Sequence, residues 1–252
     1  MRPPLRIAIL ECDTPLENAN AKYGGYGGVF TALLRASAKA LGQPDKLDPE
    51  TGLEISKWDV VNGEEYPNLE DIDAILMTGS RHNSFDDIPW INRLVEFTRK
   101  VLAQDRVRII GVCFGHQILG RALGVKVGRN DAGWEISVCD VDLTEKGKEL
   151  FQRDKLRLQQ MHRDIVFYYP PDVVPLGSSP RCAVQGMYSS RRFITVQGHP
   201  EFTEEIVSEI LQSRRAAGIF TEDEYKDAIA RVGNEHDGIA VGMAFLRFLM
   251  EE

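Results

Sequence analysis

Cysteine is scarce in this chain: four copies, spread from Cys12 to Cys182, stand among 252 residues. They form no CxxC pair, and no group of histidines has the spacing of a zinc site, so we expect no metal centre. Their wide separation along so long a chain is also unlike a disulfide framework. A reducing compartment is therefore the simpler expectation.

Long apolar runs and an excess of positive charge are missing as well. The first apolar segment, residues 7–10, is too short for a signal sequence or a membrane span, so we expect a cytoplasmic protein with no membrane contact. Lys and Arg total 30 against 38 Asp and Glu, which gives a net charge of −8. This balance argues against nucleic acid and anionic membranes as partners.

No glycine-rich phosphate cradle is present, and we expect no cofactor. The one glycine-dense stretch, residues 24–28, lacks the Lys-Ser/Thr pair of a P-loop, and we interpret it as a flexible loop near the site or as a bare connector. No repeat, low-complexity tract or linker divides the chain. We therefore predict one domain over residues 1–252, with a core at 6–215 and additional C-terminal helices at 216–252.

What the chain does contain is a regular alternation of buried-strand and amphipathic-helix patterns. Apolar runs predict strands at residues 6–10, 55–61, 72–77 and 107–112, and helical spacing predicts helices at 29–41, 90–102 and 114–123. Residues 125–196 are β-rich, and helices are predicted again at 204–214, 222–231 and 239–250. This order is typical of an α/β fold whose mainly parallel sheet carries helices on both faces.

The most informative stretch is Ile110-Gly-Val-Cys-Phe-Gly-His-Gln117. Gly111, Cys113 and Gly115 have the spacing of a nucleophile elbow, at a turn from a buried strand into a helix. Glycine is needed on both sides because the turn is sharp and a side chain there would collide with nearby backbone. The N-terminus of the following helix favours a thiolate. An isolated cysteine is more often a core residue, but the glycine spacing and the element order favour a nucleophile.

A thiolate nucleophile needs a base that can later protonate the leaving amine. His199 is the best candidate, because it follows an apolar strand at 193–196 and Gly198, and Pro200 then makes the turn rigid. Glu201 can project to the same side and orient the imidazole. The other histidines are interpreted first as surface or structural residues: His82, His116, His162 and His236.

Together, Gly-Val-Cys-Phe-Gly-His-Gln at 111–117 and Gly-His-Pro-Glu-Phe at 198–202 resemble the two signature motifs of class I glutamine amidotransferases. The resemblance implies a flavodoxin-like sheet with the elbow at its C-terminal edge. It also implies a catalytic triad and an oxyanion hole of two backbone N–H groups. The triad is Cys113, His199 and Glu201, and the oxyanion donors are Gly79 and Phe114.

The same resemblance implies four substrate-binding residues. Gln117 matches the position that helps to hold the substrate glutamine. His162 and Asp164 lie in a segment that resembles the family's substrate-flanking strand, although Arg163 stands where glycine is usual. Trp134 lies in a Gly-Trp stretch that resembles the free-standing members, including plant γ-glutamyl peptidases, and it fits a core position equally well.

Three functions are open at this point. The first is a hydrolase that acts alone on a small-molecule γ-glutamyl substrate through a thioester on Cys113. The second is a glutaminase subunit that delivers ammonia to a separate synthetase partner, because the sequence contains no synthetase half. The third, a non-catalytic binding or regulatory protein, is disfavoured by the intact triad positions, and the extra C-terminal helices favour the first.

Overall fold

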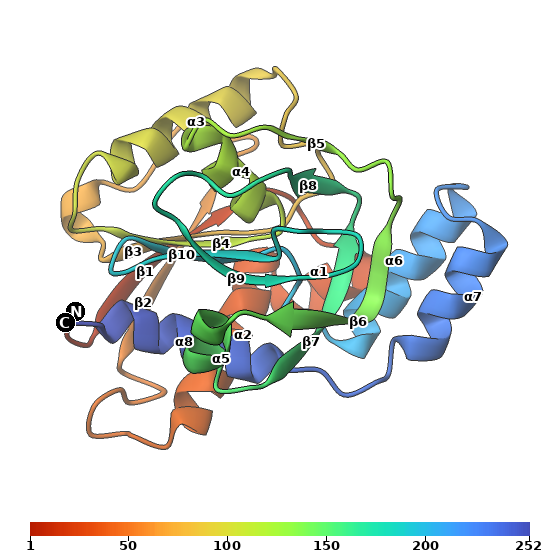
Figure 1. The fold of residues 1–252 in the computed structure, drawn as a ribbon. Helices are drawn as coiled ribbons and strands as arrows, with labels where there is room; N and C mark the ends of the chain where they lie inside the picture. Colours follow the sequence, from red (N-terminus) through yellow and green to blue (C-terminus); the bar gives the residue numbers. More distant parts are fainter.

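A nine-stranded mixed sheet forms the centre of the molecule in the computed structural model, which describes residues 1–252 (Figure 1). The strands run in the order β2 (Leu53–Asp59), β1 (Leu5–Glu11), β3 (Ala74–Met77), β4 (Arg108–Val112), β11 (Phe193–Val196), β10 (Gly186–Ser189), β9 (Val174–Ser178), β6 (Glu135–Leu143) and β7 (Lys155–His162). From β2 to β11 neighbouring strands are parallel, and beyond β11 they are antiparallel. The parallel half begins with the 2-1-3-4 order of flavodoxin-like folds, so the predicted fold class is confirmed.

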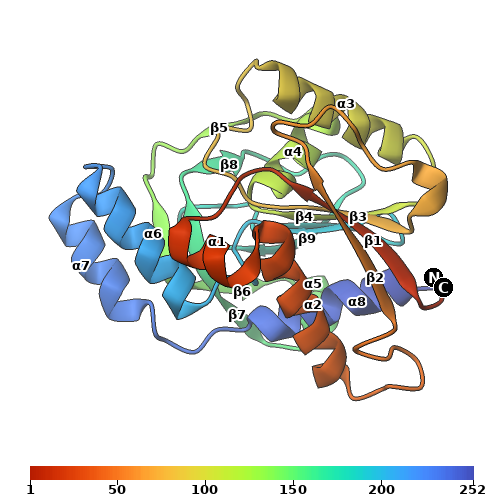
Figure 2. The same cartoon turned by 180° about the vertical axis from the view of Figure 1, so that it is seen from behind.

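Helices cover both faces of the sheet (Figures 1 and 2). One face carries α2 (Tyr26–Leu41), α5 (Glu145–Phe151) and α8 (Gly238–Met250), and the other carries α3 (Pro89–Leu102) and α4 (Phe114–Ala122). Beside the β6–β7 hairpin lie α1 (Glu17–Tyr23), α6 (Glu204–Ala216) and α7 (Glu222–Arg231). The two chain ends meet, and the Met1 ammonium donates a hydrogen bond to the Leu249 carbonyl (3.1 Å). No helix has the length and apolarity required to cross a membrane.

The first strand shows why the sequence folds into a covered sheet. Ile7 and Ile9 belong to the core under α2 and α8, whereas Ala8 and Leu10 belong to the core under α3 and α4. Successive side chains of a strand point to opposite faces. A strand that is buried on both faces therefore requires a continuous apolar run instead of alternation, and this run is what made the segment recognisable.

Five short elements had no individual prediction: α1, the 3₁₀ helix Leu69–Asp71, α5, β5 (Val127–Arg129) and β8 (Asp164–Val166). Strands β5 and β8 lie inside the stretch predicted as β-rich and form a separate two-stranded sheet. Helix α5 lies inside the stretch predicted as β-rich, where Thr144 caps it by accepting a hydrogen bond from the Gly147 N–H (3.1 Å). Helices α1 and α5 have only 7 residues each. This is about two turns, too short for a periodic pattern to be recognised.

The interpretation of residues 24–28 as a flexible loop or bare connector was wrong. The stretch is the junction of two helices: Gly24 ends α1 in the left-handed conformation (φ 66°), and α2 begins at Tyr26. A Cβ atom on Gly28 would lie 1.8 Å from the Tyr23 carbonyl oxygen. Glycine is therefore required here by left-handed capping and by close backbone approach.

Candidate active site

Cys113 occupies the sharp turn between β4 and α4. Its backbone has φ 51° and ψ −101°, a conformation that L-residues rarely adopt. A Cβ atom on Gly111 would lie 2.8 Å from the Gly115 carbonyl oxygen, and one on Gly115 would lie 2.4 Å from the Met77 carbonyl oxygen. The predicted strand-to-helix turn and its steric need for glycine are both confirmed.

His199 is held in a single orientation beyond the end of β11. Its Nδ1 lies 2.8 Å from Oε1 of Glu201, and both side chains are buried. The Phe202 ring stacks on the imidazole at 3.9 Å with an interplanar angle of 4°. The backbone N–H of His199 also donates to the Gln159 carbonyl in β7 (2.8 Å). The carboxylate accepts from Nδ1, which leaves Nε2 as the nitrogen available to a thiol.

Gly79, after β3, is where the two catalytic candidates meet. A Cβ atom on Gly79 would lie 2.6 Å from Cε1 of His199 and 3.7 Å from Cβ of Cys113. The structure therefore brings together, at the carboxyl ends of β3, β4 and β11, three residues that are far apart in the sequence. This is the edge at which parallel α/β sheets bind their ligands.

The charges at this edge favour the protonated form of His199. Burial by itself lowers the pKa of His199, but the charges of Cys113 and Glu201 outweigh it and raise that pKa to about 10. An imidazole with this pKa is protonated at neutral pH and stabilises a nearby thiolate. In contrast, burial raises the pKa of Cys12 and of Cys182 to about 12, so these side chains stay thiols.

The two N–H groups predicted for an oxyanion hole flank the cysteine. Phe114 is the first residue of α4, so its N–H has no acceptor inside the helix. The Gly79 N–H makes no backbone hydrogen bond. Its loop is held by Thr78, whose hydroxyl donates to the Gly79 carbonyl (3.0 Å) and accepts from the Cys12 N–H (2.9 Å). The oxyanion role of both groups stays a prediction.

The four residues predicted to bind substrate lie around Cys113, in one small cavity of about 60 Å³. Gln117 is already engaged there: its Oε1 accepts from the Ser84 hydroxyl (2.9 Å), and its Nε2 donates to the Asp164 carbonyl (2.8 Å). His162 faces Glu135 across 3.0 Å between Nε2 and Oε2. These bonds hold the wall of the cavity, while direct binding of substrate by Gln117 and His162 stays a prediction.

Asp164 and Trp134 complete this wall. The Asp164 carboxylate accepts from Nε of Arg129 (2.6 Å). Burial raises the pKa of Asp164, with Arg129 opposing the rise. Trp134 packs edge-on against Phe220, with ring centroids 5.3 Å apart. His116, the histidine near the elbow that was interpreted as structural, does not line this cavity, and its Nδ1 pairs with the Thr195 hydroxyl (2.8 Å).

A larger cavity of about 530 Å³ opens on the His199 side and shares part of its lining with the small one. Its wall contains Arg214, in the last turn of α6, together with Tyr26 and Asp13. Sequence reasoning missed these residues. An arginine in the last turn of a helix is usually a solvated charge that complements the helix dipole, so no local signal distinguished Arg214.

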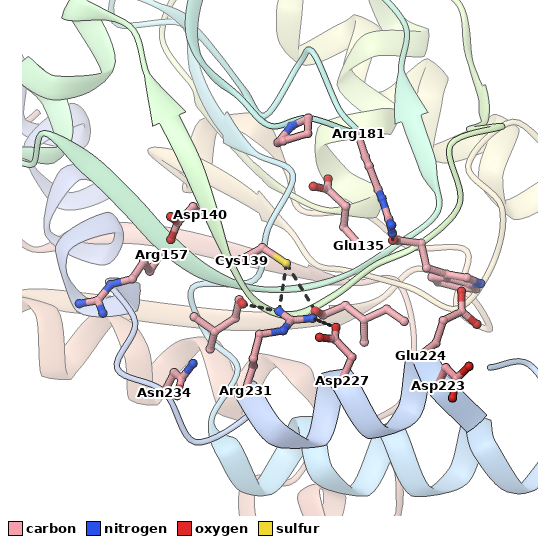
Figure 3. Close-up of a pocket in the computed structure, with 14 residues that line it drawn as sticks. Glu135, Cys139, Asp140, Arg157, Arg181, Asp223, Glu224, Asp227, Arg231 and Asn234 are labelled. Carbon is pink, nitrogen blue, oxygen red and sulfur yellow. Dashed lines mark hydrogen bonds and ion pairs between the residues drawn. The ribbon is translucent and has the colours of Figure 1, made fainter. Parts of the chain in front are cut away.

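The largest pocket, about 660 Å³, is a different place. It lies between β6, β7 and α7, and it contains neither Cys113 nor His199 (Figure 3). Arg231, at its centre, is satisfied by the Val138 carbonyl, by Asp227 and by Sγ of Cys139 (3.4 Å). This pocket lacks the pair of Cys113 and His199, so size does not identify the candidate reacting centre here.

Comparison with known proteins agrees with this geometry. The family model for glutamine amidotransferase class-I matches residues 46–213. A Schizosaccharomyces pombe protein named as glutamine amidotransferase-like is 36% identical over 249 residues, covering 97% of this chain and 98% of that protein. γ-Glutamyl peptidase 2 of Arabidopsis thaliana is 31% identical over 216 residues, covering 82% and 79%. Among solved structures, a glutamine amidotransferase from Thermotoga maritima superposes with a TM-score of 0.71 at 16% identity, covering 97% and 98%, a likeness of fold.

Proposed function

Because this chain belongs to the class I glutamine amidotransferase family, we propose that it hydrolyses γ-glutamyl amide bonds through a thioester on Cys113. With γ-glutamyl peptidases among its relatives, the chain is a hydrolase. The single observation that carries the proposal is the meeting of Cys113 with the His199–Glu201 pair at Gly79. A nucleophile, a base and a group that orients the base are the three parts required for acyl transfer.

The first half-reaction forms the thioester. The thiolate sulfur of Cys113 attacks the δ-carbonyl carbon, and the carbonyl electron pair moves to oxygen. The N–H groups of Gly79 and Phe114 stabilise this oxyanion, and removal of one such donor typically costs roughly 10²- to 10³-fold in rate. As the carbonyl re-forms, the C–N bond breaks and His199 donates its Nε2 proton to the leaving amine.

The second half-reaction releases glutamate. Water attacks the thioester carbon while neutral His199 accepts its proton, and the C–S bond breaks to return the Cys113 thiolate and the imidazolium. Glu201 keeps the imidazole in one orientation and stabilises its cationic form throughout. Every proton and electron pair is accounted for by substrate, water and these residues.

The alternative function, a glutaminase subunit that passes ammonia to a synthetase partner, shares the first half-reaction. It differs in what the isolated protein does. A partner-dependent subunit releases little glutamate until its synthetase is added, whereas a hydrolase that acts alone releases glutamate by itself. Both differ from a binding protein, which would be indifferent to loss of the Cys113 thiol.

The test is glutamate release by the purified protein from glutamine, glutathione and γ-glutamyl dipeptides. We expect release from at least one of them, and a fall of about 10³-fold or more in Cys113→Ala, since removal of a nucleophile abolishes the covalent route. Cys139→Ser is the matched control, because Cys139 is a half-buried thiol outside the site, and it should keep the full rate. Activity that survives in Cys113→Ala would refute the proposal. Silence of the folded protein on every substrate would refute independent hydrolysis in favour of a required partner.

A further inference from the structure

We propose that Arg214 binds a carboxylate on the leaving group of the substrate, so that the enzyme prefers γ-glutamyl peptides with a free carboxyl end over glutamine. The leaving group is the amino acid or short peptide whose amine is released when the γ-glutamyl bond breaks. This inference rests on the proposed function, and it assigns the larger cavity beside His199 to that leaving group.

The guanidinium of Arg214 is half-buried beside two aromatic rings, with no acidic side chain within ion-pair distance. Its central carbon lies 5.0 Å from the Trp134 ring centroid and 5.9 Å from that of Phe220. Its Nη1 is buried and makes no hydrogen bond within the protein. A buried N–H donor without a partner is costly, and a bound carboxylate would satisfy it. The planar fork of arginine matches a carboxylate with two parallel hydrogen bonds.

The other cations that line this cavity are already paired. Arg81 lies 3.3 Å from the buried carboxylate of Asp13. Arg129 lies 2.6 Å from the carboxylate of Asp164. Arg214 has no acidic side chain within ion-pair distance, so it is the cation of this wall that is available to a substrate anion. Burial also lowers the pKa of Arg214, with the charges of Cys113, Tyr26 and Asp13 opposing this.

The position of Arg214 relative to the chemistry selects the leaving group. In the proposed mechanism His199 protonates the leaving amine, so the leaving group departs on the His199 side. That side holds the cavity of about 530 Å³, and Arg214 lines both this cavity and the small one around Cys113, so it lies where the two join. Ammonia is about as large as water, whose share of liquid volume is roughly 30 Å³. The cavity therefore fits a leaving group much larger than ammonia, and its apolar wall suits aliphatic or aromatic atoms: Leu16, Tyr26, Phe202, Ile210 and Ile219.

Part of this subsite, including Arg214, lies outside the segment that matches the family model. The match covers residues 46–213, whereas Arg214 and Phe220 come directly after it and Tyr26 comes before it. The family motifs supply the reacting groups, and these flanking segments contribute Arg214 and part of the apolar wall that faces the leaving group. We therefore infer that selectivity for the leaving group is a property of the flanking segments.

The experiment measures kcat/KM on γ-glutamylalanine, on γ-glutamylalanine amide and on glutamine. The first two differ only in the free carboxylate. The native protein should have a kcat/KM on the acid that exceeds that on the amide by about 10- to 100-fold. Loss of one partner of a hydrogen bond to a charged group typically costs about this factor. Arg214→Gln should lower kcat/KM on γ-glutamylalanine by about the same factor. It should change the rates on the amide and on glutamine by less than about threefold.

Two further variants separate binding from structure. Arg214→Lys keeps the charge without the fork, so it should recover only part of the preference for the acid. Arg215→Gln removes the neighbouring arginine of the same helix, which is exposed and pairs with Glu222 (2.9 Å). Because Arg215 does not line the cavity, this matched control should leave all three rates unchanged.

Several outcomes would overturn the inference without touching the proposed function. One is equal native rates on the acid and the amide. Another is an equal loss on all three substrates in Arg214→Gln, which would place the guanidinium against the glutamyl part instead. A third is an unchanged kcat/KM on γ-glutamylalanine in an Arg214→Gln protein that a thermal denaturation curve shows to be folded. Failure of the proposed function is distinguishable, because no substrate would then release glutamate in a manner dependent on Cys113.

Discussion

Replacement of Gly79 by alanine places one methyl group against the imidazole of His199. The added carbon would lie 2.6 Å from Cε1 of the ring. Ordinary carbon–carbon separations are about 3.5–4.0 Å, so the ring must retreat by roughly 1 Å. It cannot do so freely, because Phe202 stacks on it at 3.9 Å and Glu201 holds Nδ1 at 2.8 Å.

The cost follows from this displacement. A misplacement of about 1 Å at a reacting group lowers the rate by roughly 10²-fold. Forcing an extra carbon into a packed region destabilises a protein by about 1–3 kcal/mol. We therefore expect Gly79→Ala to fold, with a moderately lower melting temperature, and to lose about two orders of magnitude in kcat/KM on its best γ-glutamyl substrate.

The assay is steady-state glutamate release beside a thermal denaturation curve. Gly128→Ala is the matched control, because its Cβ atom would make only an ordinary contact of 3.4 Å with the Phe167 ring, and it should keep its rate. A Gly79→Ala protein within threefold of the native rate would refute the reasoning. It would mean that the imidazole moves without consequence, or that His199 takes no part in catalysis.

Two further predictions concern the charges of the site. Glu201→Gln removes a negative charge that helps to raise the pKa of His199 to about 10. Because the imidazolium then loses its proton at lower pH, the alkaline limit of activity should move to lower pH. The rate at pH 7 should fall by about 10²- to 10⁴-fold. A pH–rate profile that is identical to the native one would contradict this. Iodoacetamide at neutral pH should label Cys113 first, because burial raises the pKa of Cys12 and of Cys182 to about 12. Peptide mass spectrometry checks the order, and uniform labelling would rule out an activated thiolate.

Sequence patterns predicted best those elements whose formation depends on residues that are close together in the chain. The elbow could be recognised because the sterics of one tight turn require glycine two residues before and two residues after Cys113. The strand of residues 6–10 could be recognised because it is a continuous apolar run, as burial on both faces requires. The helix of residues 90–102 could be recognised because burial repeats along it with a helical period. Short elements such as α1 and α5, with 7 residues each, have no such repeat.

The sequence by itself determined the fold class and named the candidates Cys113, His199 and Glu201, because each is marked by its immediate neighbours. Only the tertiary structure decided that Gly79 lies against both Cys113 and His199, and that Arg214 lies beside Trp134 and Phe220 with a buried, unpaired Nη1. The physical reason is that packing distances, the volume of a cavity and the absence of a counter-ion depend on which distant segments the fold brings together.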